Sequence, residues 1–328
     1  MASTSWLRSP FVILKDLESL LIQSTWFRND VVEFFLDWRT PVATAVGYLL
    51  FVAAATTFSR KYLAQRPHAA STSQGASSEG GKSPSSSIGW RPWFCGSDLK
   101  ALSVGHDLIL IGASATMFVG CFSAVVDRVQ RTSADFLLCE DPNLAVSLFS
   151  SGVKTNGNEQ TLLEVTTEDA VNRLFLWSFL YYLSKYYELL DTILQLARGR
   201  PPPQFFLHVY HHSCVLVMGW AWCTQRMSLQ FIGLLSNTFV HVVMYSYYLQ
   251  RAVTGKVPSW KRWVTQVQIL QFALSVGCFL YTISAFIVPG MQCGGWPVTM
   301  VGNILFNLML LRDFCNLAGK NAAKEKKG

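Results

Sequence analysis

Three histidines fall within five residues in the stretch FLHVYHH, which begins at Phe206. In a helix, where each residue turns by about 100°, His208, His211 and His212 would lie within an arc of about 100° on one face. With His241, four of the six histidines of the chain lie within residues 208–241. Imidazole exchanges protons near neutral pH, attacks carbonyl carbons and binds metals. The cluster therefore indicates nucleophilic, acid–base or metal chemistry at one place in the fold.

Three other apolar segments carry polar side chains at helical spacing. Residues that recur at intervals of three and four share one face of a helix, so each set forms a stripe. In chain order the stripes consist of Lys185, Glu188, Asp191 and Thr192; Asn237, His241, Met244, Tyr245 and Tyr248; and Thr265, Gln268 and Gln271.

The composition is that of a membrane protein. Only 14% of the 328 residues are charged, 51% are hydrophobic, and the mean hydropathy is +0.28. An average soluble domain carries about 25% charged residues, and a membrane helix needs roughly 20 apolar ones. The high apolar content excludes a disordered chain, the lack of a Gly period excludes a collagen-like one, and eight Cys spread over 328 residues exclude a disulfide-rich miniprotein. Seven apolar segments are about long enough to cross a bilayer, so we expect an all-α integral membrane protein with seven transmembrane helices. The segments are 42–58, 102–126, 174–196, 205–222, 229–249, 264–283 and 298–317.

Basic residues orient these spans. Seventeen Lys and Arg residues lie on the face that includes the C-terminus, against nine on the other. Because cytoplasmic loops are enriched in these residues, the C-terminus should be cytoplasmic. The net charge of +7 then reflects topology and attraction to anionic lipids or an anionic ligand, and no motif indicates nucleic-acid binding. Cys139 and Cys293 fall together on the opposite, disulfide-permissive side, either bonded to each other or as two unpaired thiols.

The polar stripes converge in depth. Counted from the expected cytoplasmic ends, Glu188, His211, His241 and Gln268 lie four to eight residues into their helices. At 1.5 Å per residue these positions are about 6 to 12 Å below the surface. An ionisable group at mid-membrane costs roughly 2.5 to 3.5 kcal/mol, so such residues usually mark function. We expect one polar chamber open to the cytosol, with deeper apolar walls that suit a long aliphatic chain.

The chain divides into three parts by composition. Residues 1–39 mix apolar and charged residues and are expected to form an amphipathic, interfacial segment. Residues 40–318 form the seven-helix domain, with a Ser-rich cytoplasmic loop at about 66–90 that is expected to be disordered. Residues 319–328 form a basic cytoplasmic tail.

Four motifs resemble the signature boxes of the ELO-type fatty-acid elongases, the 3-oxoacyl-CoA synthases of the endoplasmic reticulum. They are KYYELLDT (185–192), HVYHH (208–212), HVVMYSYY (241–248) and TQVQILQ (265–271), and they occur in the same order and spacing. The resemblance covers about residues 100–318 and leaves the N-terminal segment and the Ser-rich loop outside. It implies a seven-helix bundle around an acyl tunnel, acyl-CoA and malonyl-CoA as substrates, and no bound cofactor or metal.

The resemblance also implies residue roles. Condensation to 3-oxoacyl-CoA, CO2 and CoA would proceed through an acyl group on His211, while His241 assists malonyl decarboxylation or stabilises the enolate; the two roles could be exchanged. Asn237 and Tyr245 would donate hydrogen bonds to the developing oxyanion. The expected orienting residues are His208, His212, Lys185, Glu188 and Asp191, with Gln268 and Gln271 in support or as interhelical contacts. The candidates for the CoA phosphates are Arg198, Arg200, Arg251, Lys256, Lys261 and Arg262.

Several alternatives stay open at this point. A membrane di-iron desaturase or oxygenase also carries HxxHH motifs, although four clustered histidines are few for two irons. A non-catalytic seven-helix lipid receptor or transporter would explain the bundle but not the histidines. Cys214 is an alternative nucleophile whose thiolate an apolar setting disfavours. His106 and Asp107 could belong to the chamber or lie at the membrane interface, and the interface is the favoured placement. Lys185 with Glu188 could be a structural ion pair.

The C-terminus and the reaction suggest a location and partners. Lys324 and Lys326 resemble a cytoplasmic di-lysine retrieval signal of the endoplasmic reticulum. The expected surroundings are the lipid bilayer, the reductases and dehydratase of the elongation cycle, and a second copy in a homodimer. The preferred acyl length depends on the depth of the tunnel, which the sequence does not define.

Overall fold

The computed structural model describes residues 10–58, 96–141, 162–198, 204–286 and 293–325, and this part of the chain contains helices and no strand. The expected Ser-rich loop, Arg200 and Lys326 lie outside the described residues. The elements are α1 (Pro10–Gln23), the π-helix η1 (Phe27–Val32), α2 (Glu33–Leu36), α3 (Arg39–Phe58), α4 (Gly96–Arg131), the 3-10 helix η3 (Asp135–Leu137), α5 (Leu162–Glu188), α6 (Leu190–Ala197), α7 (Phe205–Thr224), α8 (Gln230–Thr254), α9 (Lys261–Phe286) and α10 (Pro297–Glu325).

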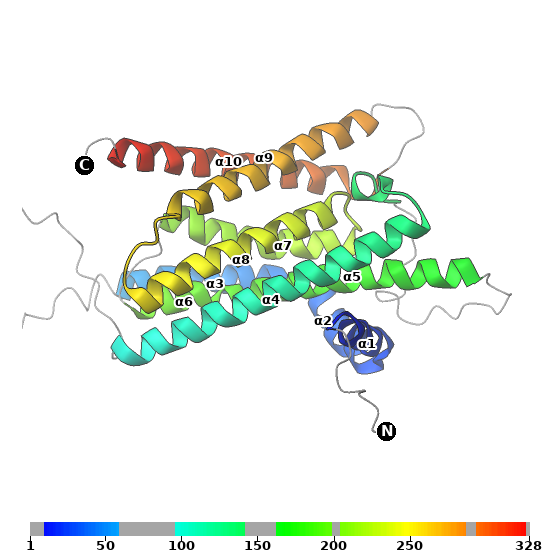
Figure 1. The fold of residues 1–328 in the computed structure, drawn as a ribbon, viewed down its shortest axis with the longest axis horizontal. Coiled ribbons are helices and arrows are strands. Elements are labelled where there is room, and N and C mark those ends of the chain that lie inside the picture. Colours follow the sequence, from blue (N-terminus) through cyan, green and yellow to red (C-terminus); the bar gives the residue numbers. More distant parts are fainter. Residues whose placement is uncertain (1–9, 59–95, 142–161, 199–203, 287–292, 326–328) are drawn as a thin grey trace, which may run out of the picture.

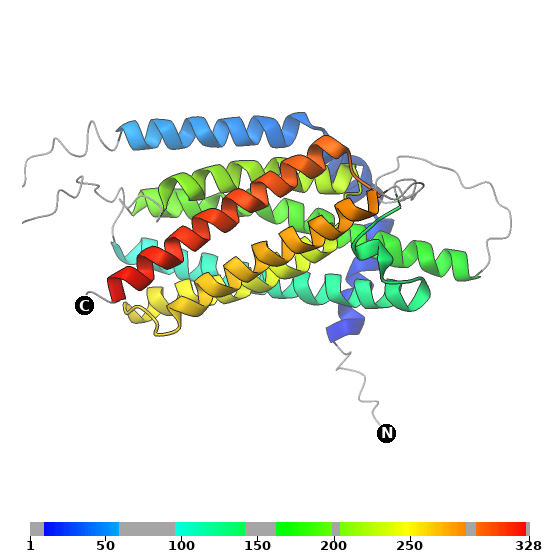
Figure 2. The same ribbon diagram turned by 90° about the horizontal axis from the view of Figure 1, so that it is seen from above.

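The long helices form one elongated bundle. Their axes run roughly along its length, whereas α1 is seen end-on and lies across them (Figure 1). Turned by 90°, the bundle shows α3 along one edge, with α9 and α10 crossing its face (Figure 2). Within the bundle, α4 packs on α5 and α8, α7 packs on α3 and α5, and α9 pairs with α10.

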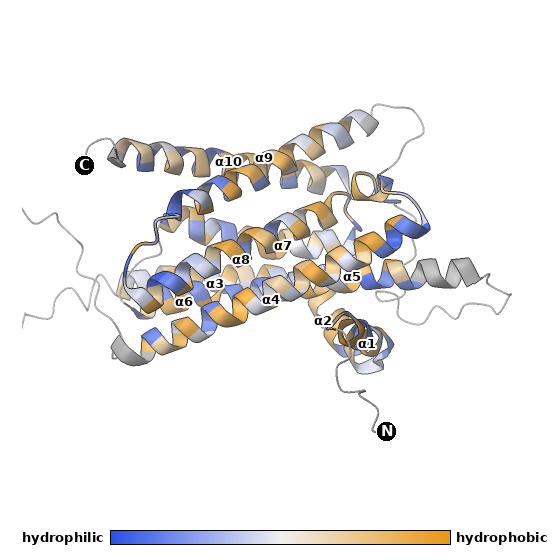
Figure 3. Ribbon diagram, in the orientation of Figure 1, coloured by the Kyte–Doolittle hydropathy of each residue, from blue (hydrophilic) through white to orange (hydrophobic). Residues whose placement is uncertain are grey.

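Four of the described helices, α3, α4, α9 and α10, are long and apolar enough to cross a membrane. Large apolar side chains are exposed along them, among them Leu50, Ile109, Leu270 and Val298. Hydrophobic residues dominate the middles of the long helices, and hydrophilic residues gather near loops and ends (Figure 3). The all-helical, multi-pass membrane class is therefore confirmed. Helices α5, α7 and α8 carry ionisable stripe residues, which lower their hydropathy, so the count of seven spans stays a prediction.

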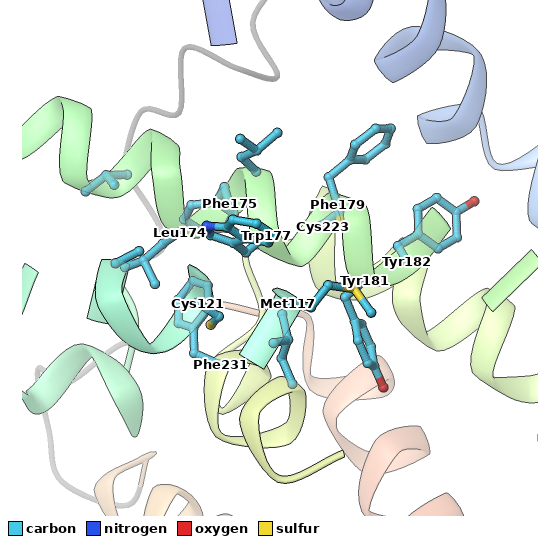
Figure 4. Close-up of a cluster of buried hydrophobic side chains, with 14 of the residues drawn as sticks. Met117, Cys121, Leu174, Phe175, Trp177, Phe179, Tyr181, Tyr182, Cys223 and Phe231 are labelled. Carbon is cyan, nitrogen blue, oxygen red and sulfur yellow. The ribbon is translucent and has the colours of Figure 1, made fainter. Parts of the chain in front are cut away.

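The main apolar core lies where α5 crosses α4 and α8. Aromatic side chains of α5 pack there against Cys121 of α4 and Phe231 of α8 (Figure 4). Close approach depends on Gly120, because a Cβ at this position would meet the Trp177 ring at 2.1 Å. Small residues at helix interfaces have this effect in membrane proteins generally. The core thus holds α4, α5 and α8 in a fixed rotation about their axes.

The N-terminal helix α1 belongs partly to the packed structure. Glu18 of α1 is 1% exposed and accepts hydrogen bonds from Arg173 Nε at 2.5 Å and Trp177 Nε1 at 2.7 Å. Leu17 and Leu20 on its other side are exposed. Helix α1 is therefore amphipathic: its polar side binds α5 through Glu18, and its apolar side is exposed. Its placement at the membrane interface stays a prediction.

A disulfide joins Cys139 to Cys293 across 154 residues. Beside it, the buried Arg128 makes a bidentate ion pair with Glu140, at 2.7 and 2.6 Å. The amide of Gly294 donates to the Glu140 carbonyl at 2.7 Å. These contacts fix the start of α10 against the end of α4.

Replacing both Cys139 and Cys293 by serine should lower the free energy of unfolding by about 2 to 4 kcal/mol, because the link restricts a long loop in the unfolded chain. Denaturant titration of the purified protein in detergent micelles measures this change. The matched control replaces the exposed Cys214 and Cys315 by serine, with an expected change within about 0.5 kcal/mol. Equal stability of the two double variants would contradict the prediction.

Candidate active site

The polar stripes meet in one cavity of about 370 Å³ between α6, α7, α8, α9 and α10. His211 and His241, which lie on different helices, both line it. The cavity therefore brings together all four clustered histidines and most of the other predicted site residues. Those that line it are His208, His211, His212, His241, Asn237, Tyr245, Glu188, Asp191, Gln268, Gln271, Arg251 and Lys261.

A buried ion pair orients Asn237 at the wall of the cavity. Lys185 Nζ donates to Glu188 Oε1 at 2.7 Å and to Asn237 Oδ1 at 3.1 Å. Tyr181 donates its hydroxyl to the same Asn237 oxygen at 2.9 Å. An ammonium group can only donate, so Asn237 must turn its oxygen toward Lys185. The amide NH2 is then the end of Asn237 that can donate to a bound ligand. Lys185 itself is 1% exposed and is not among the lining residues.

His241 belongs to the same network. Its Nδ1 lies 3.5 Å from Glu188 Oε1, and its ring meets Tyr245 at 5.5 Å between centroids. The other carboxylate oxygen of Glu188 is buried and has no hydrogen-bond partner among the described residues. One carboxylate therefore faces both an ammonium group and an imidazole inside the chamber.

Among the HxxHH histidines, His211 and His212 are held by ring contacts, whereas His208 Nε2 lies 2.8 Å from Thr192 Oγ1. His212 lies between His208 and His211, with centroid distances of 4.4 and 5.4 Å. His211 stacks on Phe306 of α10 at 5.8 Å and 12°. Within the described part of the chain, the Nδ1 atoms of His211 and His212 are buried without a hydrogen-bond partner. The ring of His211 is thus fixed in its plane by an aromatic surface.

Sequence reasoning missed Phe306. It lies on the face of α10 that also supplies four cavity-lining residues, Leu310, Phe314, Leu317 and Asn321. Their spacing of three to four residues marks one helical face. However, an apolar face of a membrane helix can point to lipid as well as to a cavity, so the spacing alone does not assign Phe306 to the site.

The structure starts the expected helix over 174–196 earlier, at Leu162, and tightens it at Leu189. Helix α5 ends at Glu188 and α6 begins at Leu190. The Leu189 amide bonds to the Tyr186 carbonyl, and the Thr192 amide bonds to the Leu189 carbonyl, which are short-range contacts typical of a tightened turn. The backbone of Leu189 stays helical (φ −61°, ψ −23°), so the stripe from Lys185 to Thr192 follows one helical path with a tightened turn in its middle.

His106 and Asp107 are 5% and 7% exposed, so both are buried in the bundle, although neither lines the cavity. His106 Nε2 lies 2.9 Å from Asp191 Oδ1. Tyr245 donates its hydroxyl to Asp191 Oδ2 at 2.6 Å. A hydroxyl has one proton, so in this arrangement Tyr245 orients Asp191 instead of donating to an oxyanion.

The predicted basic residues separate into two groups. Arg251 and Lys261 line the cavity. Arg198 instead donates to the Leu99 carbonyl at 3.4 Å, Arg262 lies 5.7 Å from the Trp263 ring, and Lys256 is exposed. Loop charge alone therefore does not identify the residues at the mouth of the chamber.

Two other candidates can be placed. Cys214, the alternative nucleophile, is exposed and is not among the lining residues. In the part of the chain that the structure describes, no three His, Cys, Asp or Glu side chains are arranged to hold a metal ion together, as the di-iron alternative would require.

Comparison with known proteins adds to this geometry. The chain is 30% identical over 185 residues to fatty acid elongase sre1 of Dictyostelium discoideum, covering 56% of this chain and 59% of that protein. It is 33% identical over 155 residues to fatty acid elongase 4 of Trypanosoma brucei brucei, covering 46% and 60%. It is 31% identical over 175 residues to human very long chain fatty acid elongase 5, covering 51% and 52%.

These alignments span about half the length of the relatives. A model of the ELO: GNS1/SUR4 family matches residues 33–328. The match begins well before residue 100, so the similarity extends further toward the N-terminus than the four motifs indicate. The chain belongs to the ELO: GNS1/SUR4 family.

Proposed function

We propose that the protein is a fatty-acid elongase that condenses a long-chain acyl-CoA with malonyl-CoA and releases 3-oxoacyl-CoA, CO2 and CoA. The observation that carries this proposal is the shared chamber of His211 and His241, with the Asn237 amide at its wall. Family membership supports the same reaction, because the relatives above are named fatty acid elongases.

In the first step a neutral imidazole nitrogen of His211 attacks the thioester carbonyl of acyl-CoA. The carbon–sulfur bond breaks, and the CoA thiolate takes up the proton that the imidazole loses. The products are an acyl-imidazole on His211 and free CoA. A covalent intermediate divides one difficult substitution into two easier ones. The stacking of His211 on Phe306 supports this role, because it holds the ring in one plane.

In the second step malonyl-CoA loses CO2, and the resulting enolate attacks the acyl carbonyl. The bond between the acyl carbon and the imidazole nitrogen breaks, and the ring regains a proton from solvent. His241 assists decarboxylation and stabilises the enolate, while the Asn237 NH2 group donates to the developing oxyanion. Donors that are already oriented before the reaction lower such barriers strongly. The scheme uses no bound cofactor or metal.

The surroundings of the chamber fit these substrates. Arg251 and Lys261 suit the CoA phosphates, and the apolar side chains of Phe272 and Leu310 suit the acyl chain. The bundle would cross the bilayer seven times around an acyl tunnel. The C-terminus would face the cytosol, with Lys324 and Lys326 retaining the protein in the endoplasmic reticulum. The 3-oxoacyl-CoA product needs reduction and dehydration, so reductases and a dehydratase are the expected partners. We also propose that two copies of the chain associate as a homodimer.

The test is an elongation assay on the purified protein. Acyl-CoAs of graded chain length are incubated with labelled malonyl-CoA, and 3-oxoacyl-CoA is measured by mass spectrometry. We expect a product two carbons longer than the substrate, with a maximum at one range of chain length. The Cys214→Ala variant should keep the wild-type rate. No product at any chain length from well-folded protein would overturn the proposal.

A further inference from the structure

The first turn of α6 connects four other helices through two adjacent side chains. Thr192 contacts Tyr48 of α3 and His208 of α7, and Asp191 contacts His106 of α4 and Tyr245 of α8. We call Asp191 and Thr192 the α6 hub. The tightened helical turn at Leu189 lies directly before the hub.

The Thr192 branch forms a chain of three polar groups. Tyr48 Oη and His208 Nε2 each lie 2.8 Å from Thr192 Oγ1, and Thr192 is fully buried. The threonine hydroxyl has one proton, so it donates to one neighbour and accepts from the other. A phenol is a stronger donor than an aliphatic alcohol. Tyr48 therefore donates to Thr192, Thr192 donates to His208 Nε2, and the proton of a neutral His208 is placed on Nδ1.

The Asp191 branch reaches the other side of the chamber. Asp191 accepts the Tyr245 hydroxyl proton at 2.6 Å and meets His106 Nε2 at 2.9 Å. Tyr245 lines the cavity and packs against His241. The buried His106 thus orients the Asp191 carboxylate, and this carboxylate in turn holds the Tyr245 hydroxyl. Removing a partner from a buried polar group leaves that group unsatisfied, and the remaining groups then move or rotate.

We infer that Tyr48 and His106 are positioning residues of the condensing reaction, acting through the α6 hub on His208 and Tyr245. This inference rests on the proposed function. Both residues lie far from the signature motifs in sequence, on helices that contribute no side chain to the lining of the cavity. Small errors in the placement of reacting groups cost about 10²-fold in rate, so these two contacts should affect turnover more than binding.

The test compares the steady-state kinetics of full-length variants. Tyr48→Phe removes only the hydroxyl, and we expect kcat to fall about 10- to 100-fold with KM for acyl-CoA within about threefold of wild type. Thr192→Val interrupts the same chain at its middle. If the hydroxyls act as one chain, the double variant should be no slower than Thr192→Val alone, because the effects of coupled residues are not additive.

His106 is tested by a conservative pair of substitutions. His106→Leu should lower kcat about 10- to 100-fold, whereas His106→Gln, which keeps an N–H donor near the position of Nε2, should retain most of the activity. Tyr182→Phe is the matched control: its hydroxyl donates to the Phe35 carbonyl, away from the hub, so kcat should not change.

The outcomes separate the inference from the proposed function. An active wild type with unchanged kcat in Tyr48→Phe and His106→Leu would overturn the inference alone. Equal losses in His106→Leu and His106→Gln, or additive losses in Tyr48→Phe and Thr192→Val, would also overturn it, because they indicate packing effects instead of hydrogen bonding. A wild type without any product would remove the proposed function and the inference with it.

Discussion

Replacing His211 by alanine should lower the rate of condensation by at least about 10³-fold, because the reaction loses its nucleophile. Acyl-CoA binding should be nearly unchanged, since the acyl chain and CoA contact other parts of the chamber. The measurement is product formation from labelled malonyl-CoA, together with an acyl-CoA binding titration.

A covalent readout identifies the nucleophile. Wild-type protein incubated with acyl-CoA alone should carry one acyl group on a peptide containing residue 211, detected by mass spectrometry. His241→Ala should still form this adduct but fail to transfer it to the malonyl carbon. Cys214→Ala serves as the control that retains both steps. An adduct on His241 instead would exchange the two roles, and full activity in His211→Ala would rule out an acyl group on His211.

Replacing Lys185 by methionine should lower the free energy of unfolding by about 3 to 5 kcal/mol, since it leaves the Glu188 carboxylate buried without its cation. Lys185 and Glu188 are each 1% exposed and lie 2.7 Å apart. Methionine keeps much of the side-chain volume, so the charge and its hydrogen bonds are the main loss. Denaturant titration in micelles measures the change.

The matched control combines Lys185→Met with Glu188→Gln. Removing both charges leaves no uncompensated carboxylate, so the double variant should regain at least about half of the stability lost in Lys185→Met. It should still be catalytically impaired, because the Asn237 oxygen keeps only the Tyr181 hydroxyl as a donor and His241 loses the carboxylate beside its Nδ1. A single variant as stable as wild type would show that the pair does not stabilise the fold, and an active double variant would show that Asn237 does not depend on Lys185.

The helices and the residue types at the site could be predicted because both depend on local sequence. Apolar length defined segments that agree with α3, α7 and α9 to within three residues, whereas α8 and α10 continue five and eight residues beyond the expected ends. The spacing of Asn237, His241 and Tyr245 placed them on one face wherever that helix packs. The polar residues lie at similar distances from the expected cytoplasmic ends of their helices, which predicted that the stripes would meet. Residues of all four stripes line the cavity.

The contacts between distant helices could not be predicted in this way. The tightened turn at Leu189 has no Gly or Pro beside it that would mark it in the sequence. His106 near a helix end suits an interface equally well, and only the packing of α4 beside α6 directs it to Asp191. Among the basic residues, loop position does not distinguish Arg251 from Arg262, since the direction of each side chain depends on how α8 and α9 are rotated.

The amino-acid sequence by itself determined that this chain builds membrane helices with inward histidines and carboxylates, because hydropathy and a period of 3.6 residues are properties of a single segment. Tertiary structure decided which groups meet: Tyr48 with Thr192, His106 with Asp191, and Phe306 with His211. These partners are separated by tens of residues or more, and their contacts depend on the rotation and crossing of whole helices. That rotation is fixed by close packing at positions such as Gly120 and Trp177, which no local pattern specifies.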